Sequence, residues 1–341
     1  MPLINKIIGQ QMNSDIENTK ELPIIAITGA SGFIGKNLVR TLANSGKFEI
    51  RVLTRNMQKA SFDHGNITVI EGDLEKPGMV EDFVLPGCTV VNLAYNFNAT
   101  NADNRNAAMN LITICKKNKI KRLIHCSTAA VFGRVKKDVI NENTPCLPRS
   151  EYGVTKLSIE DMFFSEAKGN YEFVNLRPTA VFGADGQALI KLIMDLRTGG
   201  KILNYVRSCL FNTRKLNLVS VNNVTAAIIF MIKAEAQVVS GQTYIISEDD
   251  DLNNNFRYVE NYLYKEFVGN GFRIPRLKIP LVILSLLLRL LGRDSSNPYQ
   301  VYDSAKILGA GFNYVASLDS ELNHFVAWYK SKLVGQHHEN L

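Results

Sequence analysis

The 341-residue sequence has few cysteines and no arrangement of them that indicates a structural role. The five are odd in number and widely spaced, without a C-x-x-C pair, and they are Cys88, Cys115, Cys126, Cys146 and Cys209. This usage argues against both a disulfide framework and a zinc site. We therefore expect a reducing, cytoplasmic environment and no bound metal.

Long hydrophobic runs are also missing. Residues 1–22 contain no sustained apolar stretch, so they do not resemble a signal peptide, and we expect a flexible leader. The leucine-rich segment 279–291 is about a dozen residues long and contains Arg289, whereas a membrane-spanning helix needs about 20 apolar residues. We expect a packed amphipathic helix there and no transmembrane segment.

Signals for nucleic-acid binding are missing too. Aromatic and basic residues are not interleaved, and there is no internal repeat or low-complexity segment. The net charge of +7 fits an anionic small-molecule substrate, and it fits a basic surface without a partner equally well. With 46% hydrophobic and 21% charged residues, the composition is that of a globular protein, long enough for a nucleotide-binding domain and a smaller lobe.

A glycine-rich turn joins the first predicted strand, residues 24–27, to a predicted helix that includes residues 36–42. Glycine permits close backbone approach, and the free N–H groups of a helix's first turn bind pyrophosphate well. The dinucleotide fingerprint is G-x-G-x-x-G, whereas the first gap here is one residue longer, so an ordinary strand–helix junction stays an alternative. The cofactor-binding residues predicted at this turn are Gly29, Ser31, Gly32, Phe33, Ile34 and Gly35.

The second predicted strand, residues 49–53, is followed by a basic residue, Arg55. Arg55 stands where an acidic residue would hold the ribose 2′-hydroxyl of NAD, and where an arginine accommodates the 2′-phosphate of NADP. This favours NADP as the cofactor and leaves NAD possible. The alternative is that Arg55 is a solvated loop charge.

Two further strand ends complete the predicted cofactor site. The strand at 67–70 is followed by Asp73 and Leu74, where the carboxylate could recognise an adenine amino group. The strand at 89–93 continues into Ala94, whose small side chain leaves room for a cofactor to cross the edge of the sheet.

The candidate catalytic residues are Thr128, at the hydroxyl-rich end of the fifth predicted strand, and Tyr152 and Lys156, which follow 24 residues later. The spacing of the last two places them on one helix face. Tyr302 and Lys306 repeat the Tyr-x-x-x-Lys spacing, but no hydroxyl-ended strand precedes them. We therefore assign catalysis to the first pair.

A tyrosine transfers protons readily only if its pKa falls from ~10 towards neutrality, which corresponds to ~4 kcal/mol for three units. The ammonium of Lys156, together with an oxidised nicotinamide, would favour the phenolate of Tyr152. Thr128 would hydrogen-bond the substrate oxygen, and Lys156 could also hold the nicotinamide ribose. The alternative is three unrelated surface residues.

Five motifs occur in order along the chain. They are Thr28-Gly-Ala-Ser-Gly-Phe-Ile-Gly35, Gly72-Asp-Leu74, Ser127-Thr-Ala-Ala-Val-Phe-Gly133, Tyr152-Gly-Val-Thr-Lys156 and Arg177-Pro-Thr-Ala-Val-Phe-Gly183. From about residue 23 to 328 the sequence resembles the extended short-chain dehydrogenases/reductases, in their nucleotide-sugar epimerase/dehydratase branch. The resemblance implies the roles given above for Thr128, Tyr152 and Lys156, and it places Pro178 beside the cofactor.

The sequence also departs from that branch. Ala129 and Ala130 stand where the 4,6-dehydratases have Asp and Glu, and methyl groups cannot transfer protons, so a dehydratase is disfavoured. Ala180 replaces the Asn with which hexose 4-epimerases contact substrate phosphates. This replacement weakens the case for a nucleotide-sugar substrate. Arg293 matches the spacing of a diphosphate-binding Arg in the branch and is predicted to bind substrate. Its alternative role is to neutralise a helix C-terminus.

We predict an α/β fold with a Rossmann-type doubly wound parallel sheet and a smaller C-terminal substrate lobe. The predicted parts are a leader 1–22, a cofactor domain 23–177 plus 216–247, a lobe 178–215 plus 248–330, and a tail 331–341. The resemblance also implies a homodimer through the Tyr152 helix. The predicted function is reduction of a keto group on a nucleotide-activated sugar for polysaccharide or O-antigen precursors. An NAD-dependent nucleotide-sugar epimerase and a non-catalytic NADP-binding sensor remain alternatives.

Overall fold

The computed structural model describes most of the chain. The residues described are 22–59, 62, 64–76, 78, 80–133, 135–269, 275–277 and 297–338. Most of the predicted leader, the predicted helix at 279–291, Arg293 and the last three residues of the tail lie outside the described residues.

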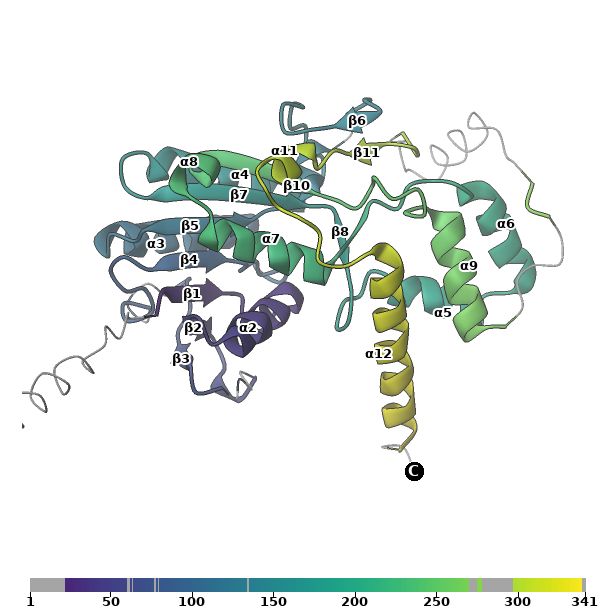
Figure 1. The fold of residues 1–341 in the computed structure, drawn as a ribbon, viewed down its shortest axis with the longest axis horizontal. Coiled ribbons are helices and arrows are strands. Elements are labelled where there is room, and N and C mark those ends of the chain that lie inside the picture. The colour runs from purple at the N-terminus through teal and green to yellow at the C-terminus, as the bar shows by residue number, and fades with distance from the viewer. Residues whose placement is uncertain are drawn as a thin grey trace, which may run out of the picture.

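A seven-stranded parallel sheet forms the centre of the molecule (Figure 1). Its strands are β1 (Ile24–Thr28), β2 (Glu49–Thr54), β3 (Ile67–Glu71), β4 (Thr89–Asn92), β5 (Arg122–Cys126), β7 (Glu172–Pro178) and β10 (Gln242–Ile246). Their order is β10-β7-β5-β4-β1-β2-β3, and every neighbouring pair is parallel. The predicted doubly wound parallel sheet is confirmed.

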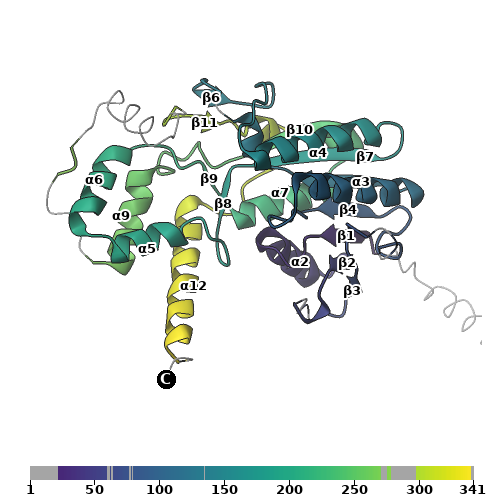
Figure 2. The same ribbon diagram turned by 180° about the vertical axis from the view of Figure 1, so that it is seen from behind.

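Helices cover both faces of the sheet, because successive residues of its buried strands point to opposite sides. In β1, Ile25 and Ile27 pack into one hydrophobic cluster and Ala26 into another. The first cluster receives α2 (Phe33–Ser45), α7 (Val221–Lys233), α8 (Ala236–Val239) and α11 (Ala305–Gly309). The second receives α3 (Asn101–Lys117) and α4 (Glu151–Ala167), which lie in front of the sheet in Figure 2.

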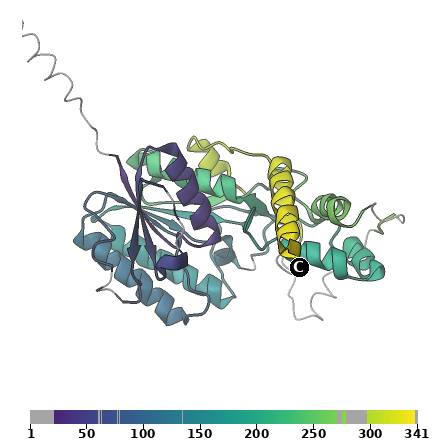
Figure 3. The same cartoon turned by 90° about the horizontal axis from the view of Figure 1, so that it is seen from below.

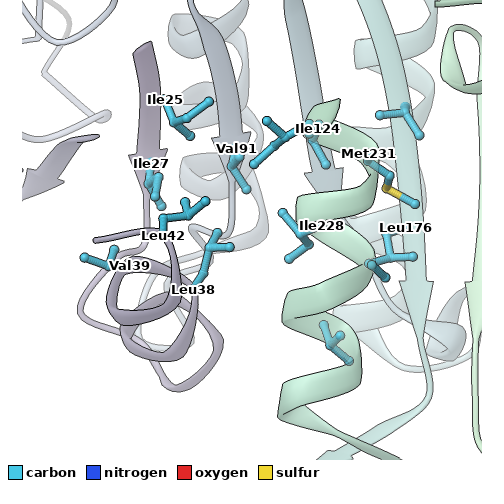
Figure 4. Packing of buried hydrophobic residues seen from close by; sticks show 14 of the residues in the cluster. Ile25, Ile27, Leu38, Val39, Leu42, Val91, Ile124, Leu176, Ile228 and Met231 are labelled. Atoms are coloured by element: carbon cyan, nitrogen blue, oxygen red, sulfur yellow. The ribbon is translucent and has the colours of Figure 1, made fainter. Parts of the chain in front are cut away.

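The two helix layers are clearly visible from below (Figure 3). In this view the sheet is nearly edge-on, with α2 on one side and the pair α3 and α4 on the other. Figure 4 shows how the first layer packs: Ile27 lies beside Leu42 of α2 and Val91 beside Leu38, while Leu176 lies against Ile228 of α7. Burial of such side chains from water supplies most of the stabilisation of this domain.

A second group of helices forms a lobe beside the sheet (Figure 1). It consists of α5 (Ile190–Thr198), α6 (Lys201–Phe211), α9 (Phe256–Phe267) and α12 (Leu318–His338). Two small parallel sheets accompany it, β8 (Ala180–Phe182) with β9 (Leu218–Ser220), and β6 (Val139–Ile140) with β11 (Val301–Tyr302). Short 3-10 turns occur at η1 (Met57–Lys59) and η3 (Ala129–Phe132). Ile307 and Phe312 pack with the sheet rather than the lobe, and the domain boundaries stay a prediction.

Candidate active site

The turn between β1 and α2 can be built only with glycine at two positions. Gly29 has φ +69, and a Cβ there would lie 2.7 Å from the carbonyl carbon of Leu93. A Cβ on Gly35 would lie 2.2 Å from the carbonyl oxygen of Gly29. Both distances are shorter than real contacts, so glycine is required at position 29 by close packing against the residues after β4 and at position 35 by close packing within the turn.

The N-terminus of α2 is open towards this turn. Gly32 provides no side-chain cap, and the first turn of the helix contains no acidic residue. The N–H of Gly32 donates to Gly29 O at 3.0 Å, whereas those of Phe33, Ile34 and Gly35 donate to no group in the described part of the chain. Free N–H groups at the positive end of a helix fit a pyrophosphate. The residues present therefore fit a dinucleotide cofactor, and the pyrophosphate-binding role of Gly32 stays a prediction.

A cavity extends from this turn along the carboxyl ends of β2, β3 and β4. Seven of the predicted cofactor-binding residues line it: Gly29, Ser31, Gly32, Arg55, Asp73, Leu74 and Ala94. Arg55 is exposed at the rim. Tyr95 and Asn92 also line the cavity and were not predicted. Asn92 could have been suspected from sequence, because it is a polar residue at the end of an otherwise apolar strand.

Asn92 belongs to a buried hydrogen-bonded row that crosses three strands. The hydroxyl of Thr28 donates to Asn92 Oδ1 at 2.6 Å, and Asn92 Nδ2 lies 3.1 Å from His125 Nδ1. Asn92 Oδ1 also accepts from the N–H of Ala94 at 3.3 Å. Burial lowers the pKa of His125 well below its ordinary value, and the charge of Lys156 acts in the same direction. Neutral His125 thus accepts from Asn92, and the row fixes the backbone where β4 enters the cavity.

The three predicted catalytic residues meet at the end of β5. The side chain of Thr128 accepts from the N–H of Ala130 at 3.2 Å and lies close enough to Tyr152 to affect the pKa of that residue. Lys156 Nζ donates to the carbonyl of Cys126 at 2.7 Å. Ser150 caps α4 by accepting from the N–H of Gly153 at 3.1 Å, so Tyr152 and Lys156 lie in the first two turns of one helix. The structure brings together what the spacing predicted.

Burial shifts the pKa values of both ionisable side chains at this site. Burial raises the pKa of Tyr152 to about 12, although the neighbouring hydroxyl of Thr128 opposes the rise. Burial also lowers the pKa of Lys156 to about 8. The expectation that Lys156, together with an oxidised nicotinamide, draws the pKa of Tyr152 towards neutrality stays a prediction, because in the chain by itself removal from water disfavours both charged forms. Tyr152 is therefore a protonated acid over the physiological range.

A buried ion pair fixes α4 against β7. Arg177 Nε lies 3.1 and 3.2 Å from the carboxylate oxygens of Glu160, and Arg177 Nη2 lies 2.5 Å from Glu160 Oε2. Both side chains are more than nine-tenths buried. The negative charge of Glu160 raises the pKa of Lys156 and so partly offsets the effect of burial. This pair links α4, which carries Tyr152 and Lys156, to the sheet.

Thr128 lines a second cavity. Its lining includes Ala129, Ala130, Arg149, Pro178, Ala180 and Tyr302. Pro178 thus lies in this cavity and does not line the first one. Arg149 is the one basic residue among the described residues that line it. Tyr302, assigned no role from sequence, reaches this cavity through β11 and lies 6.1 Å from the ring of Phe132.

Two aromatic rings pack on Tyr152, and one of them, that of Tyr95, lines the first cavity. The ring of Tyr95 meets Tyr152 edge-on at 4.9 Å, and Phe97 stacks on Tyr152 at 5.5 Å. Phe97 is 78% exposed, which is unusual for its size. Sequence reasoning missed both residues, because nothing in the stretch after β4 shows that it lies over α4.

Two kinds of site are not found in the described part of the chain. No helix there is long and apolar enough to span a membrane. No group of three or more His, Cys, Asp or Glu side chains there could hold a metal ion.

Residues 25–247 match the model of the NAD dependent epimerase/dehydratase family. The chain is 26% identical over 272 residues to the N-acetyl-alpha-D-glucosaminyl-diphospho-ditrans,octacis-undecaprenol 4-epimerase of Escherichia coli O157:H7, covering 75% of each chain. It is 26% identical over 247 residues to the decarboxylating sterol-4-alpha-carboxylate 3-dehydrogenase of Saccharomyces cerevisiae, covering 66% of this chain and 70% of the relative.

A solved structure supports the fold. The Bordetella bronchiseptica enzyme WbmG, in complex with NAD and UDP, superposes with a TM-score of 0.68 at 19% identity, covering 91% of this chain and 96% of that one. The family match extends over well more than half of the chain, from β1 to the end of β10, and it includes the glycine turn and the residues at the end of β5. The protein therefore belongs to the NAD dependent epimerase/dehydratase family.

Proposed function

We propose that this chain is an NADP-dependent oxidoreductase that reduces a keto group on a sugar carried by a diphosphate. The observation that carries the proposal is the position of Tyr152 beside Thr128, because Thr128 lines the second cavity and Tyr95, whose ring packs on Tyr152, lines the cavity with the predicted cofactor residues. A carbonyl held in the second cavity against these hydroxyls can receive a proton on its oxygen.

The cofactor, when bound, supplies the hydride; the residues of the chain bind, orient and protonate. Tyr152, protonated because of its raised pKa, donates a proton to the substrate oxygen. Thr128 holds that oxygen through a second hydrogen bond. Lys156 carries a positive charge below about pH 8, and this charge favours the phenolate that Tyr152 becomes.

Two features of the cavities narrow the range of reactions that the chain could catalyse. Ala129 and Ala130 offer only methyl groups to the second cavity, so the described lining contains no acid for elimination of water. Arg55 stands at the end of β2 on the rim of the first cavity, where a guanidinium can pair with a 2′-phosphate. These residues favour reduction with NADPH. Because WbmG was solved in complex with NAD, NAD stays the alternative cofactor for this chain.

A second candidate is an NAD-dependent sugar 4-epimerase, in which the same residues remove and return the hydrogen. The name of the Escherichia coli relative, an epimerase of an undecaprenyl-diphosphate-linked sugar, favours it. The two comparisons suggest two groups that could carry the sugar through its diphosphate. The name of the Escherichia coli relative suggests a polyprenol, and the UDP bound to WbmG suggests a nucleoside. Arg149 is positioned to contact the diphosphate of either carrier, in addition to the role predicted for Arg293.

The test is a panel of 4-keto and 4-hydroxy sugars on uridine and thymidine diphosphates and on a short polyprenyl diphosphate. A reductase oxidises one NADPH for each product formed. An epimerase changes the sugar without net consumption of NADPH. Cofactor binding without turnover on the whole panel would contradict both readings and support a sensor. Light scattering of the same sample tests the proposed homodimer through α4.

A further inference from the structure

Helix α6 presents an apolar surface to solvent. Ile202, Leu203 and Val206 are 81%, 58% and 43% exposed. At about 100° per residue these three side chains share one side of the helix with Leu210, which is half-buried. We call Ile202, Leu203 and Val206 the apolar arc of α6. A surface helix normally turns such an arc towards the core, so this orientation is the reverse of the usual one.

The polar side of α6 faces inwards and is held there. Asn204 is buried and donates to two backbone carbonyls at the end of α5, at 3.2 and 3.3 Å. Ser208 is buried and donates to the carboxylate of Glu260 on α9, which Arg276 pairs at 3.2 Å. Rotation of α6 to bury its apolar arc would leave these groups unpaired in the core, which is costly. The outward arc is therefore a fixed feature of the lobe.

The charges around the arc are mostly positive. Helices α5 and α6 carry the basic residues Lys191, Arg197, Lys201 and Arg207 and a single acidic residue, Asp195. Asp195 is paired with Arg207 at 2.9 Å, which leaves three exposed cations on the two helices, Lys191 and Arg197 on α5 and Lys201 next to the arc on α6. Apolar side chains bordered by lysine and arginine are the signature of a helix that lies in the interface of an anionic membrane.

We propose that the apolar arc of α6 docks the lobe on the surface of a bilayer that contains anionic phospholipid. Met194 of α5 and Leu277 are also exposed, at 55% and 67%, and extend the apolar area that the lobe shows to solvent. Figures 1 and 2 place α6 at the end of the molecule away from the sheet, so docking there leaves the cofactor cavity free. The inference goes beyond the proposed reaction and does not depend on it, because attachment is measured without turnover.

Co-sedimentation of the full-length protein with vesicles tests the proposal. We expect binding to vesicles of phosphatidylcholine and phosphatidylglycerol, and binding weaker by about tenfold or more to phosphatidylcholine alone. The triple variant Ile202→Gln, Leu203→Gln, Val206→Gln should lower the partition coefficient by about 10²-fold, because the buried apolar area is lost. Lys201→Gln should lower it by about fivefold, and only with phosphatidylglycerol present.

The matched control is Met109→Gln on α3, an apolar residue that is 42% exposed and lies in the cofactor domain. It should bind vesicles like the wild type. Absence of vesicle binding, or equal binding by the wild type and the triple variant, overturns the proposal. The melting temperature of the triple variant gives a further check. If it falls by several degrees while the wild type does not bind vesicles, the chain itself covers the arc, and the proposal is overturned. A lower molecular mass for the triple variant in solution means that a second copy covers the arc, with the same consequence.

Discussion

The buried position of Lys156 leads to a pH profile that can be calculated. Burial lowers its pKa from 10.5 to about 8, so the fraction that carries a charge falls from about 0.9 at pH 7 to about 0.1 at pH 9. Tyr152, with a pKa of about 12, stays protonated over this range. If the proposed role of the ammonium is correct, kcat/KM should fall about tenfold between pH 7 and pH 9.

The assay is the initial rate of NADPH oxidation, with kcat/KM for NADPH measured from pH 6 to pH 10, because this quantity reports the free enzyme. Lys156→Arg replaces the ammonium with a guanidinium that does not deprotonate, so its activity, although lower, should not decline between pH 7 and pH 9. Lys306→Arg is the matched control, since Lys306 donates to the carbonyl of Thr243 and should keep the wild-type profile. A wild-type profile that stays flat to pH 10, or a decline at the same pH in Lys156→Arg, would refute the reasoning.

The same shift has a consequence for stability. The pKa of Lys156 is depressed in the folded protein, so between about pH 8 and pH 10.5 the unfolded chain holds more protons. The free energy of unfolding of the wild type should therefore rise with pH over this window, relative to Lys156→Met, by up to about 3 kcal/mol. Urea denaturation at both ends of the window measures the difference, and an unchanged difference would mean that the lysine is solvated.

Three further substitutions test the site. Tyr152→Phe should lower turnover by about 10²–10⁴-fold while cofactor affinity stays nearly unchanged. The control is Tyr262→Phe, which loses a hydroxyl on the lobe. Similar losses of turnover in both variants would rule out Tyr152 as the proton donor. Arg55→Asp should weaken NADP binding by about 10²-fold and spare NAD, whereas equal effects on both would disprove 2′-phosphate recognition. Glu160→Gln should lower the free energy of unfolding by about 3 kcal/mol, because it leaves a buried guanidinium unpaired, and Arg177→Met should restore most of it; urea curves that show no recovery would contradict this account.

Local signals in the sequence were enough for the fold and for much of the site. The strand, glycine turn and helix around Gly29 and Gly35 follow from backbone sterics and from hydrophobic periodicity within a dozen residues. The i, i+4 spacing of Tyr152 and Lys156 predicted a shared helix face, because helical geometry is fixed. The order of the motifs led to the family that the match over 25–247 confirms.

Contacts between distant segments could not be predicted in this way. Asn92 meets His125 only because β4 and β5 are neighbours in one register, and Tyr302 reaches the second cavity only because β11 pairs with β6. Phe97 lies over Tyr152 for a similar reason, since the end of β4 approaches α4. No local pattern encodes these pairings, so they were missed.

The direction of the pKa shifts was also decided by the tertiary structure. The sequence determined that Tyr152 and Lys156 would be neighbours, and neighbouring charge alone predicts a lowered tyrosine pKa. The fold removes both side chains from water, and this loss of solvation is the largest cause of both pKa shifts in the chain by itself. Which side of α6 faces water was decided in the same way, because the partners of Asn204 and Ser208 come from α5 and α9. The sequence by itself determined which groups are present and how they are spaced along each element; only the packed structure decided how much water each of them keeps.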